Sequence, residues 1–326
     1  MKILIDTYGA DAGSKVTIEG AILAKEQREF TPVFIGNERE IKLIIHDRIH
    51  DYEIIPTDSF ISNDEDPVRA IRKKKDSSIV LAYEKAKEEG YDGIISAGST
   101  GALLSGGLFV GGRIKGIKRA CLAVAVPSVT GGITLLMDSG ANMDCKPEFL
   151  YEFALMGSVF LENVMGVSRP TIGLLNVGVE EHKGNKLTKE TYSLLKNSNL
   201  NFVGNVEARD LFAGKVDVLI ADGFDGNIAI KTAEGILKLM AKELKSTIYK
   251  SPKNKIAGGL LKKDLKATAS NFSTDKVGGA PLLGVKSYVY KAHGNTNELA
   301  FSNAILGLMD YIETNTIEKI EGELND

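Results

Sequence analysis

Short runs of apolar residues recur along the whole chain, and most of them end abruptly at a glycine, aspartate, asparagine or serine. A helical pattern usually follows each run. Parallel strands that are covered on both faces and feed crossover helices have this pattern. The sequence therefore predicts an α/β fold in which a mostly parallel sheet is flanked by helices. We expect strands at residues 3–5, 33–35, 53–55, 93–96, 122–126, 133–137, 171–175, 201–203, 216–221 and 285–290. We expect helices at residues 15–25, 77–89, 100–109, 147–164, 188–197, 226–249 and 296–313.

The number of expected strands bears on the domain organisation. So many strands exceed one small sheet, and 326 residues suffice for one large domain or for two smaller lobes. No internal repeat, low-complexity tract or linker rich in proline and serine separates two halves of the chain. We therefore predict a single interleaved unit over residues 1–326, with a division into two lobes as the alternative.

Charge, cysteines and hydropathy exclude several classes of protein. The formal net charge of −3 argues against nucleic-acid binding, because proteins that bind nucleic acid usually carry a basic domain. Cys121 and Cys145 have no metal-ligand spacing, so we expect buried free thiols in a reducing compartment and no metal site. The N-terminus lacks the apolar core of a signal peptide, and no apolar window is long enough to span a bilayer. We expect a cytoplasmic protein that does not cross a membrane.

Five of the expected strand ends are polar and rich in glycine, at residues 6–13, 96–101, 138–144, 176–185 and 222–227. In open parallel sheets ligands bind outside the carboxyl ends of the strands, so these five exits are expected to converge on one cleft. The candidate residues for binding phosphate or substrate are Asp6, Gly9, Asp11, Ser96, Gly98, Ser99, Thr100, Gly101, Asn142, Asp144, Asn185, Asn227 and Lys231.

The second exit has the composition of an anion site. Glycines allow the backbone to approach a ligand, and Ser99 and Thr100 lie at the start of an expected helix. Phosphate is the natural occupant. The alternative is a tight turn in which Ser99 only caps the helix. The fifth exit repeats the design, since Asn227 opens a long helix that carries Lys231 in its early turns. Asp222 and Asp144 could orient a ligand, or could be ordinary turn and cap residues.

Three further residues supply the positive or protonatable groups that an anionic transition state needs. Lys183 stands beside Gly184 and Asn185, and Lys291 and His293 follow the last expected strand. His293 could also be a plain turn residue. The fingerprints of dinucleotide-binding oxidoreductases, P-loop kinases, serine esterases and zinc proteases are absent from the sequence.

Residues 231–270 form a basic amphipathic segment. Residues 231–266 hold ten lysines and three acids, a net charge of +7 in a chain whose total is −3. The first half has an apolar stripe that is typical of a core-facing helix, namely Ala233, Ile236, Leu237, Met240, Leu244 and Ile248. The second half places Leu260 and Leu261 beside Lys262 and Lys263, which is typical of a helical tip that lies on an anionic membrane surface. The alternatives are docking of an acidic protein and a solvated helix face.

These motifs together resemble the bacterial phosphate acyltransferase family PlsX over nearly the whole chain. The resemblance rests on residues 6–11, 71–78, 96–102, 140–145, 173–178, 183–185, 222–227 with Lys231, 278–284 and 291–294. Two positions depart from the family pattern. The first loop reads Tyr8-Gly9-Ala10-Asp11-Ala12 where the family usually has Met-Gly-Gly-Asp-His, and Ser99 stands where the family usually has Asn. A role for a histidine in the first loop therefore does not carry over.

The resemblance implies a homodimer with a fold similar to isocitrate and isopropylmalate dehydrogenases and to phosphotransacetylase, attached peripherally to a membrane through the basic tip. It implies no cofactor. The implied reaction forms acyl-phosphate from acyl-(acyl carrier protein) and inorganic phosphate, the first step toward phosphatidic acid. On this basis Ser99, Thr100 and the backbone of residues 98–101 would hold phosphate, and the catalytic group would comprise Lys183, Lys291, His293 and Asp222.

Three other functions stay open from the sequence. A phosphotransacetylase would use coenzyme A in place of the carrier protein. A membrane-associated scaffold without activity is suggested by the altered first loop. A decarboxylating dehydrogenase is compatible with the implied fold alone.

Overall fold

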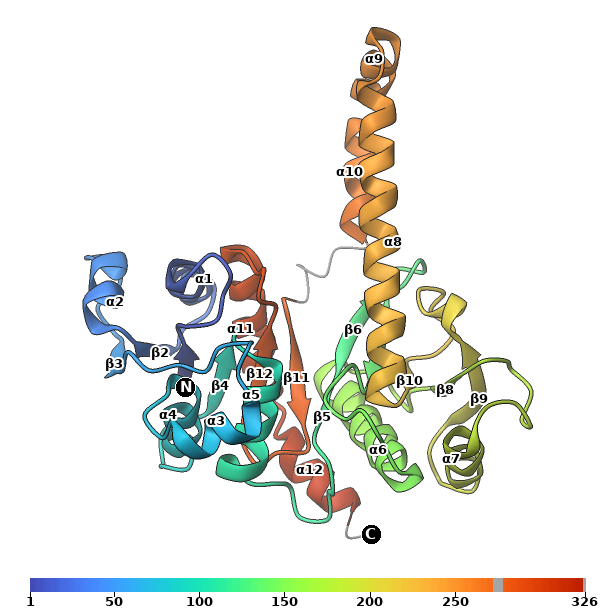
Figure 1. Cartoon of the computed structure of the whole chain (residues 1–326), viewed down its shortest axis with the longest axis horizontal. Helices are drawn as coiled ribbons and strands as arrows, with labels where there is room; N and C mark the ends of the chain where they lie inside the picture. The colour runs from blue at the N-terminus through green and yellow to red at the C-terminus, as the bar shows by residue number, and fades with distance from the viewer. Residues whose placement is uncertain (272–277, 325–326) are drawn as a thin grey trace.

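The computed structural model of the chain describes residues 1–271 and 278–324, except for the side chains of residues 266 and 269–271. The side chain of Lys266, which the charge count of the basic segment includes, therefore lies outside the described residues. The strands form two sheets, and helices pack around both of them (Figure 1).

The larger sheet has seven strands in the order β3-β2-β1-β4-β12-β11-β5. Its β1, β2, β3, β4 and β12 run parallel to their neighbours in this group, whereas β11 is antiparallel to both β12 and β5. The carboxyl ends of β1, β4 and β12 therefore meet at one edge. The bounds of the seven strands are β1 Lys2–Asp6, β2 Thr31–Gly36, β3 Glu53–Pro56, β4 Gly93–Ser96, β5 Cys121–Leu122, β11 Gly279–Leu283 and β12 Tyr288–Ala292.

The smaller sheet has five strands in the order β6-β7-β10-β8-β9. Here β7, β10, β8 and β9 are parallel, and β6 runs antiparallel to β7 at the edge. The predicted α/β class with mostly parallel strands is confirmed. The bounds of the five strands are β6 Val124–Pro127, β7 Ile133–Met137, β8 Ile172–Asn176, β9 Phe202–Glu207 and β10 Val218–Ile220.

Several helices begin at side chains that cap their free N–H groups. The Asn37 side chain accepts from Glu40 N at 3.0 Å. Asp66 caps a helix whose first residue is Pro67, a position where proline loses no hydrogen bond. The helices are α1 Ser14–Gln27, α2 Glu38–Ile45, α3 Pro67–Lys73, α4 Ser78–Lys85, α5 Thr100–Gly106, α6 Pro147–Val164, α7 Lys186–Lys196, α8 Gly223–Tyr249, α9 Pro252–Leu260, α10 Lys262–Asn271, α11 Glu298–Glu313 and α12 Thr316–Glu323. A π-helical turn, η1 (Gly107–Gly111), and a 3₁₀ turn, η2 (Ala208–Asp210), complete the set.

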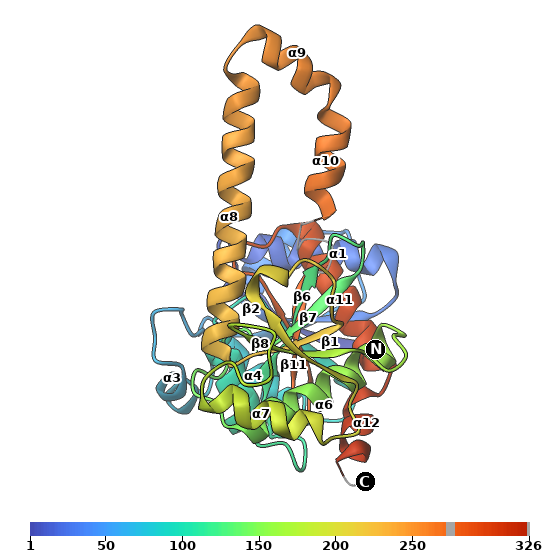
Figure 2. The same cartoon turned by 90° about the vertical axis from the view of Figure 1, so that its right-hand side faces the viewer.

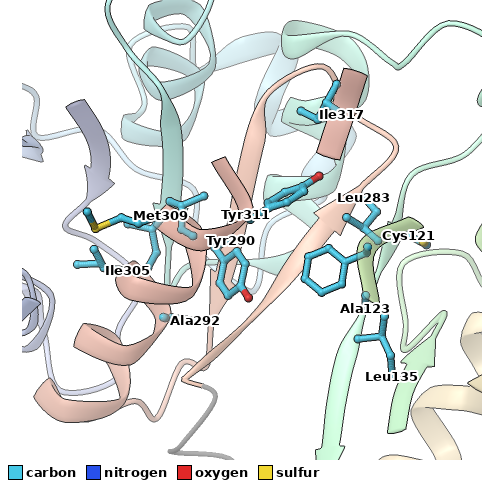
Figure 3. Close-up of a cluster of buried hydrophobic side chains, with 14 of the residues drawn as sticks. Cys121, Ala123, Leu135, Leu283, Tyr290, Ala292, Ile305, Met309, Tyr311 and Ile317 are labelled. Atoms are coloured by element: carbon cyan, nitrogen blue, oxygen red, sulfur yellow. The ribbon is translucent and has the colours of Figure 1, made fainter. Parts of the chain in front are cut away.

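One continuous hydrophobic core extends through both sheets. Figure 3 shows Leu283 and Tyr290 of the larger sheet, Leu135 of the smaller sheet and Tyr311 of α11 in the same cluster of buried side chains. Each fully buried side chain of this size stabilises the fold by about 1.5–3 kcal/mol. The choice between one unit and two lobes stays a prediction. Both cysteines are free and buried, as expected, and burial raises the pKa of each thiol.

Two expected strands differ from the structure. The run at residues 122–126 was expected as one strand, but β5 belongs to the larger sheet and β6 to the smaller, with only Ala123 between them. The run at 285–290 was expected as the last strand. In its place are two antiparallel strands, β11 and β12, and the chain turns near Gly284 at a φ of +92° that glycine adopts without strain.

The basic segment forms an arm that projects from the body of the molecule (Figures 1 and 2). We define the arm as the part of α8 after Glu234 together with α9 and α10. Figure 2 shows α8 and α10 standing apart, joined at their far ends by α9. The expectation of a core-facing stripe is wrong for this stretch, because Ile236, Met240 and Leu244 are exposed. Among the described residues, no helix combines the length and the apolar character that crossing a bilayer requires.

Candidate active site

A cleft of about 220 Å³ lies where carboxyl ends of strands from the two sheets face each other. Three of the five predicted exits, the second, third and fifth, contribute lining residues, and the loop after β12 contributes as well, whereas the first and fourth exits contribute none. The lining residues are Thr100, Leu122, Val124, Ala125, Ser139, Gly140, Asn227, Ile230, Lys231, Glu234, Gly278, Gly279, Ala280, Lys291, Ala292 and His293.

The second exit is held by a buried carboxylate. Asp6, at the end of β1, accepts from Ser96 Oγ at 2.7 Å, and Ser96 Oγ accepts from Gly98 N at 3.0 Å. Burial raises the pKa of Asp6. Ser99 caps α5, since its side chain accepts from Ala102 N at 3.4 Å. Of this exit, Thr100 lines the cleft. The structure thus gives Asp6 and Ser96 a positioning role beneath the loop.

The first exit packs directly against the second. Gly9 has a φ of +90°, and a Cβ at this position would lie 2.1 Å from the Cα of Gly98, so only glycine fits. Asp11 N donates to Gly294 O at 2.7 Å, which ties the first exit to the loop that carries His293. Gly9 and Asp11 therefore join neighbouring loops and are outside the lining of the cleft.

Lys291 is a buried cation at the end of β12, with 9% of its surface exposed. Its Nζ donates to Ala97 O at 3.1 Å and also to Ala292 O. Burial lowers the pKa of Lys291 to about 8, although the nearby carboxylates of Asp6 and Asp11 act to raise it. The ammonium is therefore mostly protonated at pH 7. Two of its three hydrogens have partners among the described residues, which leaves one for a ligand in the cleft.

His293, Lys231 and Glu234 form a group at the mouth of the cleft. The His293 Nε2 lies 4.0 Å from Glu234 Oε1, and Lys231 Nζ donates to Glu234 Oε2 at 3.2 Å. The half-exposed His293 ring has a lowered pKa because partial burial disfavours its charge, so it is mostly neutral at pH 7. Sequence reasoning missed Glu234. Its spacing from Asn227 and Lys231 puts all three residues on one helix face, and this spacing can be seen in the sequence alone.

The third exit is organised by Asp138, which is fully buried. One of its oxygens accepts from Leu122 N at 3.1 Å, and the other accepts from Asn142 N at 2.6 Å and Asn142 Nδ2 at 3.0 Å. Asn142 also donates to Ala120 O at 2.8 Å, so this side chain joins two loops. Ser139 and Gly140, which follow Asp138, line the cleft in place of Asn142.

Asp222 has a similar positioning role at the fifth exit. It caps α8 by accepting from Phe224 N at 2.8 Å, and its second oxygen accepts from Cys145 N at 2.8 Å. Both carboxylate oxygens are therefore occupied, and Asp222 is outside the lining of the cleft. The catalytic role predicted for Asp222 stays a prediction.

The structure places four other predicted site residues away from the cleft lining. Asp144 and Lys183 are exposed, and Asn185 caps α7 by accepting from Thr188 N at 2.9 Å. The loop at 176–185 leaves the smaller sheet at β8, whereas the cleft lies beside β6, β7 and the start of α8. Gly101 packs against Pro67, where a Cβ would lie 3.0 Å from a ring carbon. Roles for these residues in binding or catalysis stay predictions.

One wall of the cleft is apolar. Leu122, Val124 and Ala125 come from β5 and β6, Ile230 from α8 and Ala280 from β11. The cationic groups Lys231 and Lys291 line the same hollow together with His293, and Ala280 is the cross-strand partner of Lys291. Over residues 1–271 and 278–324 no three His, Cys, Asp or Glu side chains are grouped so that they could hold a metal ion. The arrangement suits a ligand with one anionic and one apolar part.

The chain is similar to proteins of known families. Residues 1–319 match the model of the family described as fatty acid synthesis protein. A phosphate acyltransferase from Brevibacillus brevis is 45% identical over 326 residues, which cover 99% of this chain and 97% of the relative. A phosphate acyltransferase from Clostridioides difficile is 45% identical, with 98% of this chain and 95% of the relative covered.

Solved structures that resemble the chain share its fold at low sequence identity. A phosphotransacetylase from Streptococcus pyogenes has a TM-score of 0.62 and 17% identity, with 98% of this chain and 94% of that chain covered. A 4-hydroxythreonine-4-phosphate dehydrogenase from Klebsiella pneumoniae has a TM-score of 0.50 and 12% identity, with 95% and 98% covered. The predicted isocitrate dehydrogenase-like fold is confirmed at this level, and at such identities the likeness concerns the fold alone.

Proposed function

The chain belongs to the fatty acid synthesis protein family, and from this premise we propose that it is a phosphate acyltransferase that makes acyl-phosphate from acyl-(acyl carrier protein) and inorganic phosphate. The product would feed phospholipid synthesis. Membership supports the reaction class, because the family match spans residues 1–319 and the curated relatives cover nearly the whole chain.

The single observation that carries the proposal is the composition of the cleft. Lys231, Lys291 and His293 line one hollow of about 220 Å³ together with Leu122, Val124 and similar apolar side chains. Inorganic phosphate needs the cationic side, and the first carbons of a fatty acyl thioester need the apolar side. A site that holds both reactants in contact supplies about 7–11 kcal/mol of the barrier through positioning.

The reaction needs no covalent intermediate on the enzyme. A phosphate oxygen attacks the thioester carbonyl carbon, and the carbonyl oxygen becomes an oxyanion. The C–S bond then breaks, the carrier thiolate leaves and acyl-phosphate remains. Lys231 and the Thr100 hydroxyl hold phosphate in this proposal, since both groups line the cleft. The thiolate takes up one proton.

The protonation states of Lys291 and His293 determine which of the two stabilises the oxyanion and protonates the thiolate. Lys291 has a pKa of about 8 and is a cation at pH 7, whereas His293 has a lowered pKa and is mostly neutral. Lys291 therefore stabilises the oxyanion and protonates the thiolate, and the water-poor surroundings of its ammonium strengthen that interaction. The neutral His293 ring has a single N–H, and it donates this one hydrogen bond to the reactants.

The test offers long-chain acyl-carrier protein and acetyl-coenzyme A in parallel, each with inorganic phosphate, and measures acyl-phosphate. Turnover with the carrier-bound substrate is the expected result. Turnover with acetyl-coenzyme A alone would favour a phosphotransacetylase. No turnover with either donor would favour the scaffold, and nicotinamide reduction with a hydroxy acid would favour a dehydrogenase.

We also propose that the protein is a homodimer and that it associates peripherally with an anionic membrane surface through the arm. Leu260 is 80% exposed and Leu261 is 53% exposed, beside the exposed Lys262 and Lys263. Such leucines lose water contact at a bilayer surface while the lysines meet headgroups. Sedimentation equilibrium tests the dimer, and sedimentation with anionic vesicles tests the membrane contact.

A further inference from the structure

A basic groove lies outside the cleft, where the loop after η1 meets the start of α6. Its volume is about 470 Å³, and we define it by its lining residues, Arg113, Lys118, Arg119, Lys146, Glu148 and Phe149. Four of these six residues are cationic, whereas the chain as a whole has a net charge of −3. All four cations are exposed. The groove is therefore a local concentration of positive charge on an acidic protein.

The groove is built by specific contacts. Arg113 Nη1 donates to Lys118 O at 2.7 Å, which closes the loop on itself. The buried Glu152 accepts from Lys118 N at 2.8 Å and fixes the loop to α6. The Arg119 guanidinium lies 5.5 Å from the centroid of the Phe149 ring. The backbone of the groove is thus fixed before any partner binds.

Most of the positive charge in the groove has no acidic partner among the described residues. Lys118 Nζ lies 3.5 Å from Glu152 Oε1, and this is the one ion pair that the four cations make with described residues. Within the same part of the chain, Arg113, Arg119 and Lys146 make none. Three unpaired cations around an apolar ring would attract an acidic surface, because charge complementarity steers association and fixes orientation.

The groove is close to the cleft along the chain. Arg119 precedes the cleft residue Leu122 by three positions, so their Cα atoms are at most about 11 Å apart. Lys146 follows Cys145, whose N–H is held by the cap of α8, Asp222. The tip of the arm is much farther away. From Lys231 to Tyr249 the helix alone rises about 27 Å.

We propose that the basic groove docks the acidic surface of the carrier protein that presents the acyl thioester. The inference rests on the proposed function, since it names the partner that delivers substrate to the cleft. The cations meet the carboxylates of the partner, and Phe149 and the exposed Met143 nearby in sequence supply apolar contact. The flexible prosthetic group of the carrier protein then reaches over the loop at 139–145 and places the thioester in the cleft.

The experiment reverses charge in the groove with Lys118→Glu and Arg119→Glu together. The dissociation constant for the holo-carrier protein, measured by titration at low salt, is expected to rise at least tenfold. The KM for acyl-carrier protein should rise by a similar factor, with kcat little changed. Turnover of acyl-pantetheine, which carries no charge, should stay within twofold of the unmodified protein and shows that the variant is folded.

A matched control places the same charge change on the arm, with Lys262→Glu and Lys263→Glu. This variant should bind the carrier protein as the unmodified chain does. Unchanged carrier binding in the groove variant would overturn the proposal, and weaker binding in the arm variant alone would place the carrier at the arm. Should the double groove variant not fold, Arg119→Gln is the milder change, for which a threefold rise in the dissociation constant is expected.

These outcomes separate the docking site from the reaction itself. Absence of acyl-phosphate from the unmodified protein with every donor would defeat the proposed function. If the protein forms acyl-phosphate but its binding of the carrier protein does not depend on the groove charges, only the proposed docking site is overturned. Self-association that disappears in the groove variant, with carrier binding intact, would assign the groove to a second copy of the chain and also overturn the proposal.

Discussion

Helix α8 contributes to both the cleft and the arm, but it buries residues beside the cleft and exposes apolar side chains in the arm. In the first turns of α8, Gly223, Gly226 and Ile230 are buried against the body. Beyond Glu234 the same helix exposes Ile236, Met240 and Leu244. Strands, loops and the first turns of α8 form the walls of the cleft, whereas the described part of the arm projects away from the body (Figure 2).

This difference in burial indicates which part of the molecule suits a reaction and which part suits adhesion to a surface. Around the cleft, buried carboxylates such as Asp138 and Asp222 accept several hydrogen bonds and hold loops in one geometry. Reactions need that precision. In the arm, apolar side chains lack intramolecular cover, which suits adhesion to a surface and not chemistry. We therefore expect substitutions in the cleft to change turnover and those in the arm to change location.

The largest expected effect is that of removing the buried cation. Lys291→Met should lower kcat by about 100- to 1000-fold, the range for loss of one group that stabilises an oxyanion. The matched control is Lys183→Met, which removes an exposed lysine outside the cleft lining and should change kcat by less than about threefold. Steady-state kinetics with acyl-carrier protein measures both. A large loss in the Lys183 variant would move the phosphate site toward β8.

A second prediction concerns pH. The pKa of Lys291 is lowered to about 8 by burial, so the group keeps its proton below this pH and loses it above. We expect kcat to fall about tenfold per unit as pH rises beyond this value. Asp6→Asn removes a carboxylate that raises the pKa of Lys291 and should shift the decline to lower pH. A profile flat to pH 10 would contradict the role of Lys291.

A smaller effect is expected from the neutral ring at the cleft mouth. His293→Ala should lower kcat about five- to tenfold, because one neutral hydrogen bond contributes about 1 kcal/mol net. The measurement is kcat with acyl-carrier protein at pH 7. A loss below about threefold would withdraw the donor role and leave His293 as a turn residue.

The smallest effect on turnover is expected in the arm. Leu260→Glu together with Leu261→Glu should change kcat with a short-chain donor by less than about twofold. The same variant should no longer sediment with anionic vesicles, since two leucines that would insert into the bilayer surface are replaced by carboxylates that the anionic headgroups repel. Unchanged sedimentation would contradict the membrane contact, and a large loss of turnover would mean that the arm and the cleft do not act separately.

Much of the fold was predictable because apolar runs and their polar ends are local features. The strands that end at Asp6 and Ser96 are where the pattern predicts them. Local pattern does not reveal which sheet a strand joins, so the division between β5 and β6 was missed. The strand β11 was not expected, because Gly279 and Pro281 both weaken the sequence signal of a strand. Asp66 followed by Pro67 is a sequence signal for the start of α3, but no helix was expected at these residues.

The candidate site was predictable in part for a related reason. The residues that line the cleft as predicted lie at the end of β12 or in the early turns of α5 and α8, namely Thr100, Asn227, Lys231, Lys291 and His293. The position of the fourth exit was not predictable. In the sequence both Lys183 and Lys291 follow an expected strand, and only the placement of these strands in the two sheets separates them. The sequence could not show which exits face each other.

The crossing at Ala123 connects the two sheets beside the cleft. Ala123 is the one residue between β5 of the larger sheet and β6 of the smaller sheet, and its N–H donates to Pro281 O at 3.1 Å. The side chains on either side, Leu122 and Val124, line the cleft. A reactant that packs against both side chains therefore contacts both sheets at once, and we expect slower amide exchange at Ala123 when the cleft is occupied.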